Sequence, residues 1–254
     1  MRIPPGDADS SLSRPLERHR RVRLVTQDLV GLPQGVIHLH LRPGPRVQIN
    51  NRVQAMTSLK LYDLDRSGNC YKVRLILSML GLDYERIRID STAGETQTPD
   101  FKRINPRGQI PVLVDGETVI WDSMAILVYL ARRYGGERWL PVDALGETRV
   151  MQWLAVSENE LLYGLARARI TVLFNRSFDL EQCHRDATPG LEAMEGRLAG
   201  HPWLAAEHPT IADLACYPYV SLADEGRFSL QPFPSVRAWL QRVEELPGWV
   251  AMKD

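Results

Sequence analysis

Three polar side chains stand together where a short apolar stretch passes into a helical pattern: Ser67, Asn69 and Cys70. A helix N-terminus carries unpaired N–H donors and about half a positive charge, so it stabilises an anion placed there. A hydroxyl at that position can donate a hydrogen bond to a bound thiolate and lower the pKa of the thiol. Simple helix capping explains Ser67 and Asn69 equally well, and a lone cysteine is usually a small packed apolar residue.

A second polar segment, N-P-R-G-Q-I-P-V-L, covers residues 105–113. A proline that opens a strand gives up no needed N–H donor, and X-Pro bonds adopt the cis form in tight turns. A cis bond before Pro111 would leave the backbone of Ile110 free to pair with an extended peptide ligand. The alternative for this segment is ordinary turn chemistry.

The third segment is Trp121-Asp122-Ser123, which caps a further helix. It supplies a second helix N-terminus, able to hold a carboxylate, and Asp122 beside it can hold an ammonium. Capping alone is again the alternative.

An alternation of strands and helices that begins after Met56 must position these segments. Spacing of apolar residues, caps and turn residues predict the elements. In chain order they are a strand at 59–63, a helix from 67 to 81, a strand at 87–89, a helix at 98–105, a hairpin of 111–114 with 118–120, and a helix from 122 to 136. A parallel pair followed by an antiparallel hairpin predicts a mixed sheet covered by helices.

Strand signals stop after Pro141, and the rest of the chain has helical periodicity. The helices are expected at 143–165, 180–199, 210–225 and 234–246. Pro189-Gly190 should kink or break the second of them, and Thr210 to Asp213 forms a variant of the capping box. The predicted fold class is therefore α/β + all-α, with an α/β domain over 56–138 and an all-helical domain over 143–254.

Composition narrows the function classes. The chain has 254 residues, 31 basic and 31 acidic, which argues against a generic nucleic-acid binder. It has no apolar run of the roughly 20 residues that a membrane span needs. Three scattered cysteines are too few for a disulfide scaffold or a zinc site, so we expect no metal and a reducing, cytoplasmic location.

The neutral total hides two unlike parts. Residues 1–55 hold nine arginines, no lysine and four acids, a balance of +5, and residues 56–254 have a balance of −5. The basic part has three interpretations: an organellar transit peptide, an arm for an acidic partner, or a dispensable or mistranslated upstream segment. We expect the last of these, a disordered leader with the natural chain starting at Met56.

Together the motifs resemble a known family. The order S-x-N-C-x-K-V-R at 67–74, N-P-x-G-Q-I-P-V-L at 105–113, D-S-x-A-I at 122–126, a helical region and L-P-G-W at 246–249 resembles cytosolic glutathione S-transferases of bacterial type with a serine-type active site. The resemblance spans about 57–250. It implies a thioredoxin-like βαβαββα domain that binds glutathione, a helical domain that supplies most of the electrophile pocket, and a homodimer.

The resemblance also implies roles at the first two segments. Ser67 matches the catalytic hydroxyl that stabilises the glutathione thiolate, and Asn69 matches a second glutathione contact. Gln109 would contact the glycyl end of glutathione. Ile110, before the cis Pro111, would pair with the cysteinyl backbone.

At the third segment, Asp122 and Ser123 match the pair that binds the ammonium and carboxylate of the γ-glutamyl group. Asp213 matches a capping aspartate with a structural role. Two features depart from the pattern. Tyr62 lies close enough in sequence for a tyrosine-type mechanism, and the Ser67-x-x-Cys70 spacing replaces the two-cysteine motif of redox-active relatives, leaving Cys70 as an accessory thiol.

Three functions follow from the resemblance. The first is nucleophilic transfer of glutathione, as co-substrate, to a small hydrophobic electrophile; the second is glutathione-dependent reduction of disulfides or peroxides. The third is a non-enzymatic interaction module, which would not need the residues that match the glutathione site. The electrophile itself is not identified by the sequence. Candidate walls for its pocket are Trp153, Tyr163, Arg167, Phe174 and Tyr217.

Overall fold

The computed structural model describes residues 59–252. The predicted leader at 1–55 lies outside the described residues. The elements are, in chain order, β1 Leu59–Asp63, α1 Gly68–Met79, β2 Glu85–Arg88, the 3₁₀ helix η1 Glu95–Gln97, α2 Pro99–Ile104, β3 Val112–Asp115, β4 Thr118–Trp121, α3 Ser123–Leu130, the π-helical η2 Ala131–Gly135, α4 Ala144–Val156, the π-helical η3 Ser157–Ala166, α5 Arg167–Phe174, α6 Leu180–Leu198, α7 Ile211–Ser221, the 3₁₀ helix η4 Ala223–Gly226 and α8 Pro234–Glu244.

A four-stranded mixed sheet, in the order β2-β1-β3-β4, organises the first part of the described chain. Strand β1 pairs with β2 in parallel and with β3 antiparallel, and β3 pairs antiparallel with β4. The predicted β-α-β-α-β-β-α order is confirmed. Strand β2 begins two residues earlier than expected, at Glu85.

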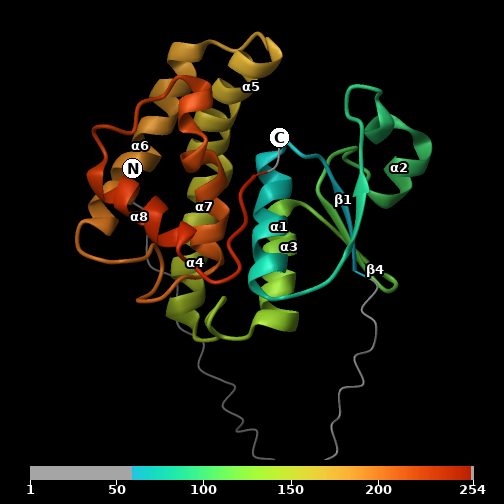
Figure 1. Ribbon diagram of the computed structural model, residues 1–254, viewed down its shortest axis with the longest axis horizontal. Helices are drawn as coiled ribbons and strands as arrows, with labels where there is room; N and C mark the ends of the chain where they lie inside the picture. Colours follow the sequence, from blue (N-terminus) through green and yellow to red (C-terminus); the bar gives the residue numbers. More distant parts are fainter. Residues whose placement is uncertain (1–58, 253–254) are drawn as a thin grey trace, which may run out of the picture. The chain divides into compact units, whose positions relative to one another are not determined.

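The two faces of this sheet are covered by different helices (Figure 1). Side chains alternate along a strand, so Leu59 and Leu61 of β1 pack in the core with α1 and α3. Tyr62 points to the other face and packs against Phe101 of α2, with ring centroids 5.9 Å apart. Helices α1 and α3 therefore lie between the sheet and the helical region.

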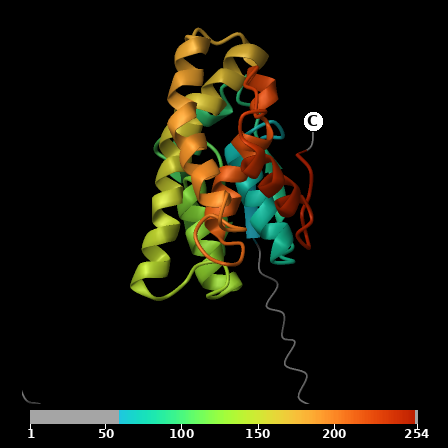
Figure 2. The ribbon, with the colours of Figure 1, turned by 90° about the vertical axis from the view of Figure 1, so that its left-hand side faces the viewer.

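Helix α7 of the helical region packs against the N-terminus of α1. A Cβ atom at Gly68, the first residue of α1, would lie 2.5 Å from Cε1 of Tyr219 in α7. Only glycine allows this approach, which places the first turn of α1 against the helical region. Figure 2 shows α7 running next to α1.

The long helix α6 differs from its prediction. It continues through Pro189 from Leu180 to Leu198 without a break. Proline removes one intrahelical hydrogen bond at a cost of about 3 kcal/mol. Tight packing on η3 offsets that cost: Ala187 and Leu191 are fully buried, and a Cβ atom at Gly164 of η3 would lie 2.5 Å from the backbone nitrogen of Ala187.

The capping box at the start of α7 is confirmed. The Thr210 N–H donates to Asp213 Oδ2 over 2.9 Å, and the Thr210 hydroxyl oxygen accepts from the N–H of Ala212. Asp213 Oδ1 also accepts from the N–H of Leu204 and from Nε1 of Trp239. One buried carboxylate thus ties a loop, α7 and α8 together.

Candidate functional site

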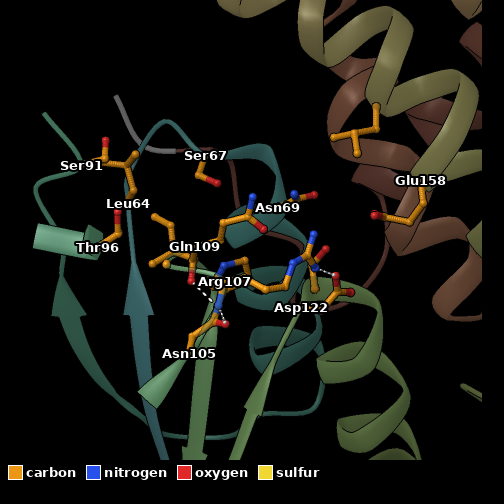
Figure 3. Close-up of a pocket in the computed structure, with 15 residues that line it drawn as sticks. Leu64, Ser67, Asn69, Ser91, Thr96, Asn105, Arg107, Gln109, Asp122 and Glu158 are labelled. Atoms are coloured by element: carbon orange, nitrogen blue, oxygen red, sulfur yellow. Dashed lines mark hydrogen bonds and ion pairs between the residues drawn. The ribbon is translucent and has the colours of Figure 1, made fainter. Parts of the chain in front are cut away.

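A pocket of about 350 Å³ lies where the N-terminus of α1, the loop before β3 and the start of α3 meet η3 of the helical region (Figure 3). All seven predicted site residues line it. Its lining consists of Leu64, Ser67, Asn69, Ser91, Thr96, Asn105, Arg107, Gly108, Gln109, Ile110, Pro111, Asp122, Ser123, Glu158 and Leu162. Three segments separated by up to 56 positions in the sequence thus come together, as the three motifs required.

Ser67 is the N-cap of α1. Its Oγ accepts a hydrogen bond from the N–H of Cys70 at 3.3 Å, which uses an oxygen lone pair and leaves the hydroxyl hydrogen able to donate. The N–H of Ser67 itself donates to the carbonyl of Leu64 over 3.0 Å. The side chain therefore acts as a cap, as one alternative held, and still offers a donor at the positive end of the helix.

Asn69 presents an unsatisfied acceptor at the same helix end. Its Oδ1 is buried and has no hydrogen-bond partner within residues 59–252. In folded proteins, the great majority of buried polar atoms have a hydrogen-bond partner. An unpaired one that lines a pocket points to a ligand that supplies the missing donor.

The loop from Asn105 to Pro111 is held by side chains. The Nδ2 of Asn105 donates to the carbonyl of Gln109 over 2.7 Å, and its Oδ1 accepts from the N–H of Arg107. The Ile110–Pro111 peptide bond is cis. In the part of the chain that the structure describes, the main chain of Ile110 makes no hydrogen bond, so it is available to an extended ligand.

Asp122 caps α3 with a strained backbone. Its φ of 80° is unusual for a residue other than glycine, and such strain is concentrated at functional sites. Its Oδ1 accepts from the N–H of Met124, and its Oδ2 forms an ion pair with Nη1 of Arg107 at 3.0 Å. Ser123 follows as the first, buried residue of the helix.

Sequence reasoning missed several lining residues, and two of them are charged. Arg107 belongs to the N-P-R-G-Q segment. A basic residue in that segment could have been predicted from the sequence to line the pocket as the partner of Asp122. Glu158 comes from η3, and no sequence motif marks it. Its Oε1 lies 3.7 Å from Nζ of Lys72, an ion pair without hydrogen-bond contact.

Cys70 and Tyr62 are placed away from reaction chemistry. Cys70 is fully buried, and burial together with the nearby Asp63 carboxylate raises the pKa of its thiol to about 12. A thiol with that pKa is almost entirely protonated at neutral pH. Tyr62 packs on the α2 side of the sheet and does not line the pocket.

The candidate wall residues divide into two groups. Tyr217 is buried in the core, and its hydroxyl contacts Glu244, so it does not line an open pocket. Trp153 is partly buried against the same core. Tyr163 and Phe174 are exposed, and the Arg167 guanidinium lies 4.1 Å from the centroid of the Tyr163 ring.

Within residues 59–252, no group of three or more His, Cys, Asp or Glu side chains is arranged to hold a metal ion. None of the helices formed by the described residues combines the length and apolarity needed to cross a membrane.

Known proteins match both parts of the chain. The glutathione S-transferase N-terminal domain matches residues 57–132, and the glutathione S-transferase C-terminal domain matches residues 178–242. Glutathione S-transferase D7 of Anopheles gambiae is 35% identical over 196 residues, which is 74% of this chain and 87% of that protein. The disulfide-bond oxidoreductase YfcG of Escherichia coli is 30% identical over 193 residues, covering 71% and 87% of the two chains.

A solved structure gives the same result. The crystal structure of a glutathione S-transferase from Pseudomonas fluorescens aligns with a TM-score of 0.73 and 39% identity, covering 77% of this chain and 99% of that one. The mixed sheet, the helical region and both domain matches agree with one another. This chain therefore belongs to the glutathione S-transferase family and is a glutathione transferase.

Proposed function

We propose that the protein transfers glutathione, through its sulfur, to a small hydrophobic electrophile, with the Ser67 hydroxyl stabilising the thiolate. The observation that carries this proposal is that Ser67, at the N-terminus of α1, shares one pocket with the other six predicted residues. A hydroxyl donor and a helix N-terminus both favour a negative charge on a sulfur placed there.

Glutathione would bind in an extended form across the pocket. Its γ-glutamyl ammonium would pair with Asp122, and the adjacent carboxylate would bind at Ser123, the N-terminus of α3. The main chain of Ile110 would pair with the cysteinyl unit, and Gln109 would contact the glycyl end. The sulfur then lies beside Ser67.

In the reaction, the bound thiol first loses its proton to solvent. Ser67 donates to the thiolate, and Asn69, which lines the same end of the pocket, is the second contact. The thiolate electron pair forms a carbon–sulfur bond with the electrophile. With an aryl halide, the halide leaves with the electron pair of the broken carbon–halogen bond.

A second candidate function is the reduction of disulfides or peroxides by glutathione. The similarity to the disulfide-bond oxidoreductase YfcG favours it. Cys70 is buried and its pKa is raised to about 12, so bound glutathione, and not a protein thiol, would be the reductant. The same pocket would serve both reactions.

Substitution of Ser67 tests the proposal. Ser67→Ala should lower the rate of aryl-halide conjugation by about 10- to 1,000-fold, the range for loss of one anion-stabilising donor. Ser78→Ala, at the other end of α1, is the matched control and should keep the wild-type rate. An unchanged rate in Ser67→Ala would refute the assigned role. A thiol–disulfide exchange assay on the same samples separates conjugation from reduction.

The proposal extends to assembly, location and chain organisation. By similarity to the family we expect a cytoplasmic homodimer with domains at 56–138 and 143–254. Size-exclusion chromatography with light scattering gives the mass of the particle. Deletion of residues 1–55 should leave retention on immobilised glutathione unchanged; lost retention would contradict the domain division.

A further inference from the structure

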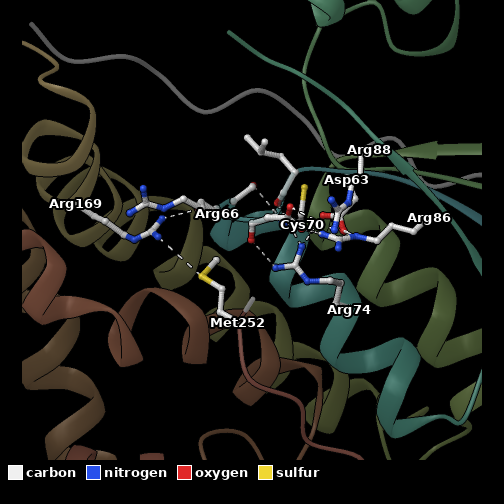
Figure 4. A network of polar contacts seen from close by, with 11 residues as sticks. Asp63, Arg66, Cys70, Arg74, Arg86, Arg88, Arg169 and Met252 are labelled. Carbon is white, nitrogen blue, oxygen red and sulfur yellow. Dashed lines mark hydrogen bonds and ion pairs between the residues drawn. The ribbon is translucent and has the colours of Figure 1, made fainter. Parts of the chain in front are cut away.

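A buried arginine of the helical region reaches the loop that carries Ser67 (Figure 4). Arg169, on α5, is only 3% exposed. Its Nη1 donates to the carbonyl of Arg66 over 2.7 Å, and its Nε donates to Glu225 over 2.6 Å. Its Nη2 lies 3.9 Å from the sulfur of Met252. The guanidinium is therefore fixed on several sides.

The loop at 64–66 has its three carbonyls held by two guanidinium groups. Arg74, on α1, donates to the carbonyls of Leu64 and Asp65 over 3.3 and 2.9 Å. Arg169 holds the next carbonyl, that of residue 66. One contact comes from the α/β part and the other from the helical region, so the loop is clamped between the two.

Two acidic side chains, Asp63 at the end of β1 and Asp65 in this loop, are paired within the α/β part. Asp63 is fully buried and binds Arg74 at 2.6 Å and also Arg86. Asp65 pairs with Arg86 and lies 3.7 Å from Arg88. These pairs fix β1 and β2 together. Arg169 has a different partner, Glu225 of η4, and its bond to the loop joins two otherwise separate networks.

The peptide unit between residues 66 and 67 is pinned at both ends. Its carbonyl accepts from Arg169, and its N–H, that of Ser67, donates to the carbonyl of Leu64. Because a peptide unit is planar and rigid, two hydrogen bonds at opposite ends fix its orientation. The direction of the Cα–Cβ bond of Ser67 depends on that plane.

We propose that Arg169, held by Glu225, is a positioning residue for the Ser67 hydroxyl. The inference rests on the proposed function of Ser67. By fixing the plane before Ser67, Arg169 keeps the hydroxyl aimed at the glutathione sulfur. A misplacement of about 1 Å can cost about 100-fold in rate, so Arg169 contributes to thiolate formation without lining the glutathione pocket.

The test compares Arg169→Met with Arg169→Lys, Glu225→Gln and an exposed control, Arg185→Met. Glu225 has a side chain that is 31% exposed, so water can solvate it when Arg169 is replaced. Ionisation of bound glutathione is followed by the ultraviolet absorbance of the thiolate as pH is varied, with kcat and KM measured on the same samples. Circular dichroism checks that each variant is folded.

We expect Arg169→Met to raise the apparent pKa of the bound thiol by about one unit, a tenfold loss of thiolate below that pKa. The kcat for conjugation should fall by about 10- to 100-fold, with KM for glutathione within about threefold of wild type. Arg169→Lys and Glu225→Gln should give smaller shifts in the same direction. Arg185→Met should give none.

A double substitution separates positioning from stability. In a Ser67→Ala background, Arg169→Met should produce no further change in the thiol pKa. If Ser67→Ala and Arg169→Met shift the thiol pKa independently and additively, the proposal is overturned. It is also overturned if Arg169→Met lowers kcat without any shift in the thiol pKa. If Ser67→Ala shifts the pKa and Arg169→Met does not, only this inference fails; if Ser67→Ala itself causes no shift, the role of Ser67 fails with it. If Arg169→Met does not fold, the pKa shifts of the bound thiol in Arg169→Lys and Glu225→Gln test the proposal: a raised pKa supports it, and an unchanged pKa overturns it.

Discussion

Lys72 places an ammonium in the interior behind the pocket, and its replacement should stabilise the protein. The side chain is completely buried. Its Nζ donates to Ser157 Oγ at 3.2 Å, lies 3.7 Å from Glu158 Oε1 and sits 4.8 Å from the centroid of the Tyr219 ring. Burial lowers the pKa of Lys72 to about 8, against the opposing effect of the Glu158 carboxylate.

The cost of this charge can be worked out from its pKa. Each pKa unit corresponds to about 1.4 kcal/mol, so a fall from 10.5 to about 8 costs the folded state about 3 kcal/mol at neutral pH. Lys72→Met removes that cost and also loses the Ser157 hydrogen bond and the ring contact, together about 1–2 kcal/mol. We expect a net stabilisation of about 1–2 kcal/mol, because the Glu158 side chain that loses its ion-pair partner is 33% exposed and can be solvated by water, unlike the remaining charge of a fully buried pair.

The gain should depend on pH in a defined direction. Between pH 8 and 10.5 the unfolded state of the wild type binds more protons at Lys72 than the folded state, so its stability rises with pH. Burial raises the pKa of the Cys70 thiol, which acts in the opposite sense above about pH 9, but equally in both proteins. The advantage of Lys72→Met should therefore be constant below pH 8 and shrink toward pH 10.

Urea denaturation at fixed protein concentration, at pH 7, 8, 9 and 10, measures this difference. Lys102→Met, at an exposed position of α2, is the control for loss of one charge without burial. The reasoning is refuted if Lys72→Met is less stable than wild type by more than about 1 kcal/mol at pH 7, or if the difference between the two proteins is independent of pH.

Three further outcomes follow from buried polar groups. Asp213→Ala should lower the free energy of unfolding by about 3 kcal/mol, because Trp239 and two backbone N–H groups lose their acceptor; thermal denaturation measures it. Asn105→Ala should raise KM for glutathione by about tenfold, since its amide holds the carbonyl of Gln109; steady-state kinetics at varied glutathione check this. Cys70 should resist alkylation at pH 8 until the protein is denatured, which peptide mass spectrometry detects.

Local sequence signals predicted the parts of the pocket that depend on short-range geometry. A serine before an apolar helical pattern is a cap, and Ser67 is one. An Asp-Ser pair after a hairpin starts a helix, and Asp122 caps α3. Each cap fixes its own helix end through a bond two or three residues away, so the sequence near it contains the information. The alternation of strands and helices predicted the mixed sheet, whereas the strand order β2-β1-β3-β4 depends on long-range pairing and was not predicted.

The side of the pocket formed by the helical region could not be predicted in this way. Glu158 lies in a π-helical segment that interrupts the expected 3.6-residue period, so its direction cannot be read from spacing. The bond from Arg169 to residue 66 spans 103 positions. Both contacts depend on how the helices pack on α1, which is a property of the tertiary structure. The sequence predicted a kink or a break at Pro189, and the absence of a break in α6 depends on tertiary packing in the same way.

The charge on the helical side bears on the choice between conjugation and reduction. Reduction of a disulfide through glutathione needs two molecules in turn: one thiolate attacks the disulfide, and a second attacks the resulting mixed disulfide to release oxidised glutathione. The second molecule carries net negative charge and would enter a pocket lined by the carboxylate of Glu158, whose charge the ammonium of Lys72, 3.7 Å from Oε1, offsets in part. A neutral electrophile avoids the remaining repulsion and can pack on Leu162. We therefore expect Glu158→Gln to increase disulfide exchange more than conjugation, and an equal effect on the two rates would contradict this reasoning.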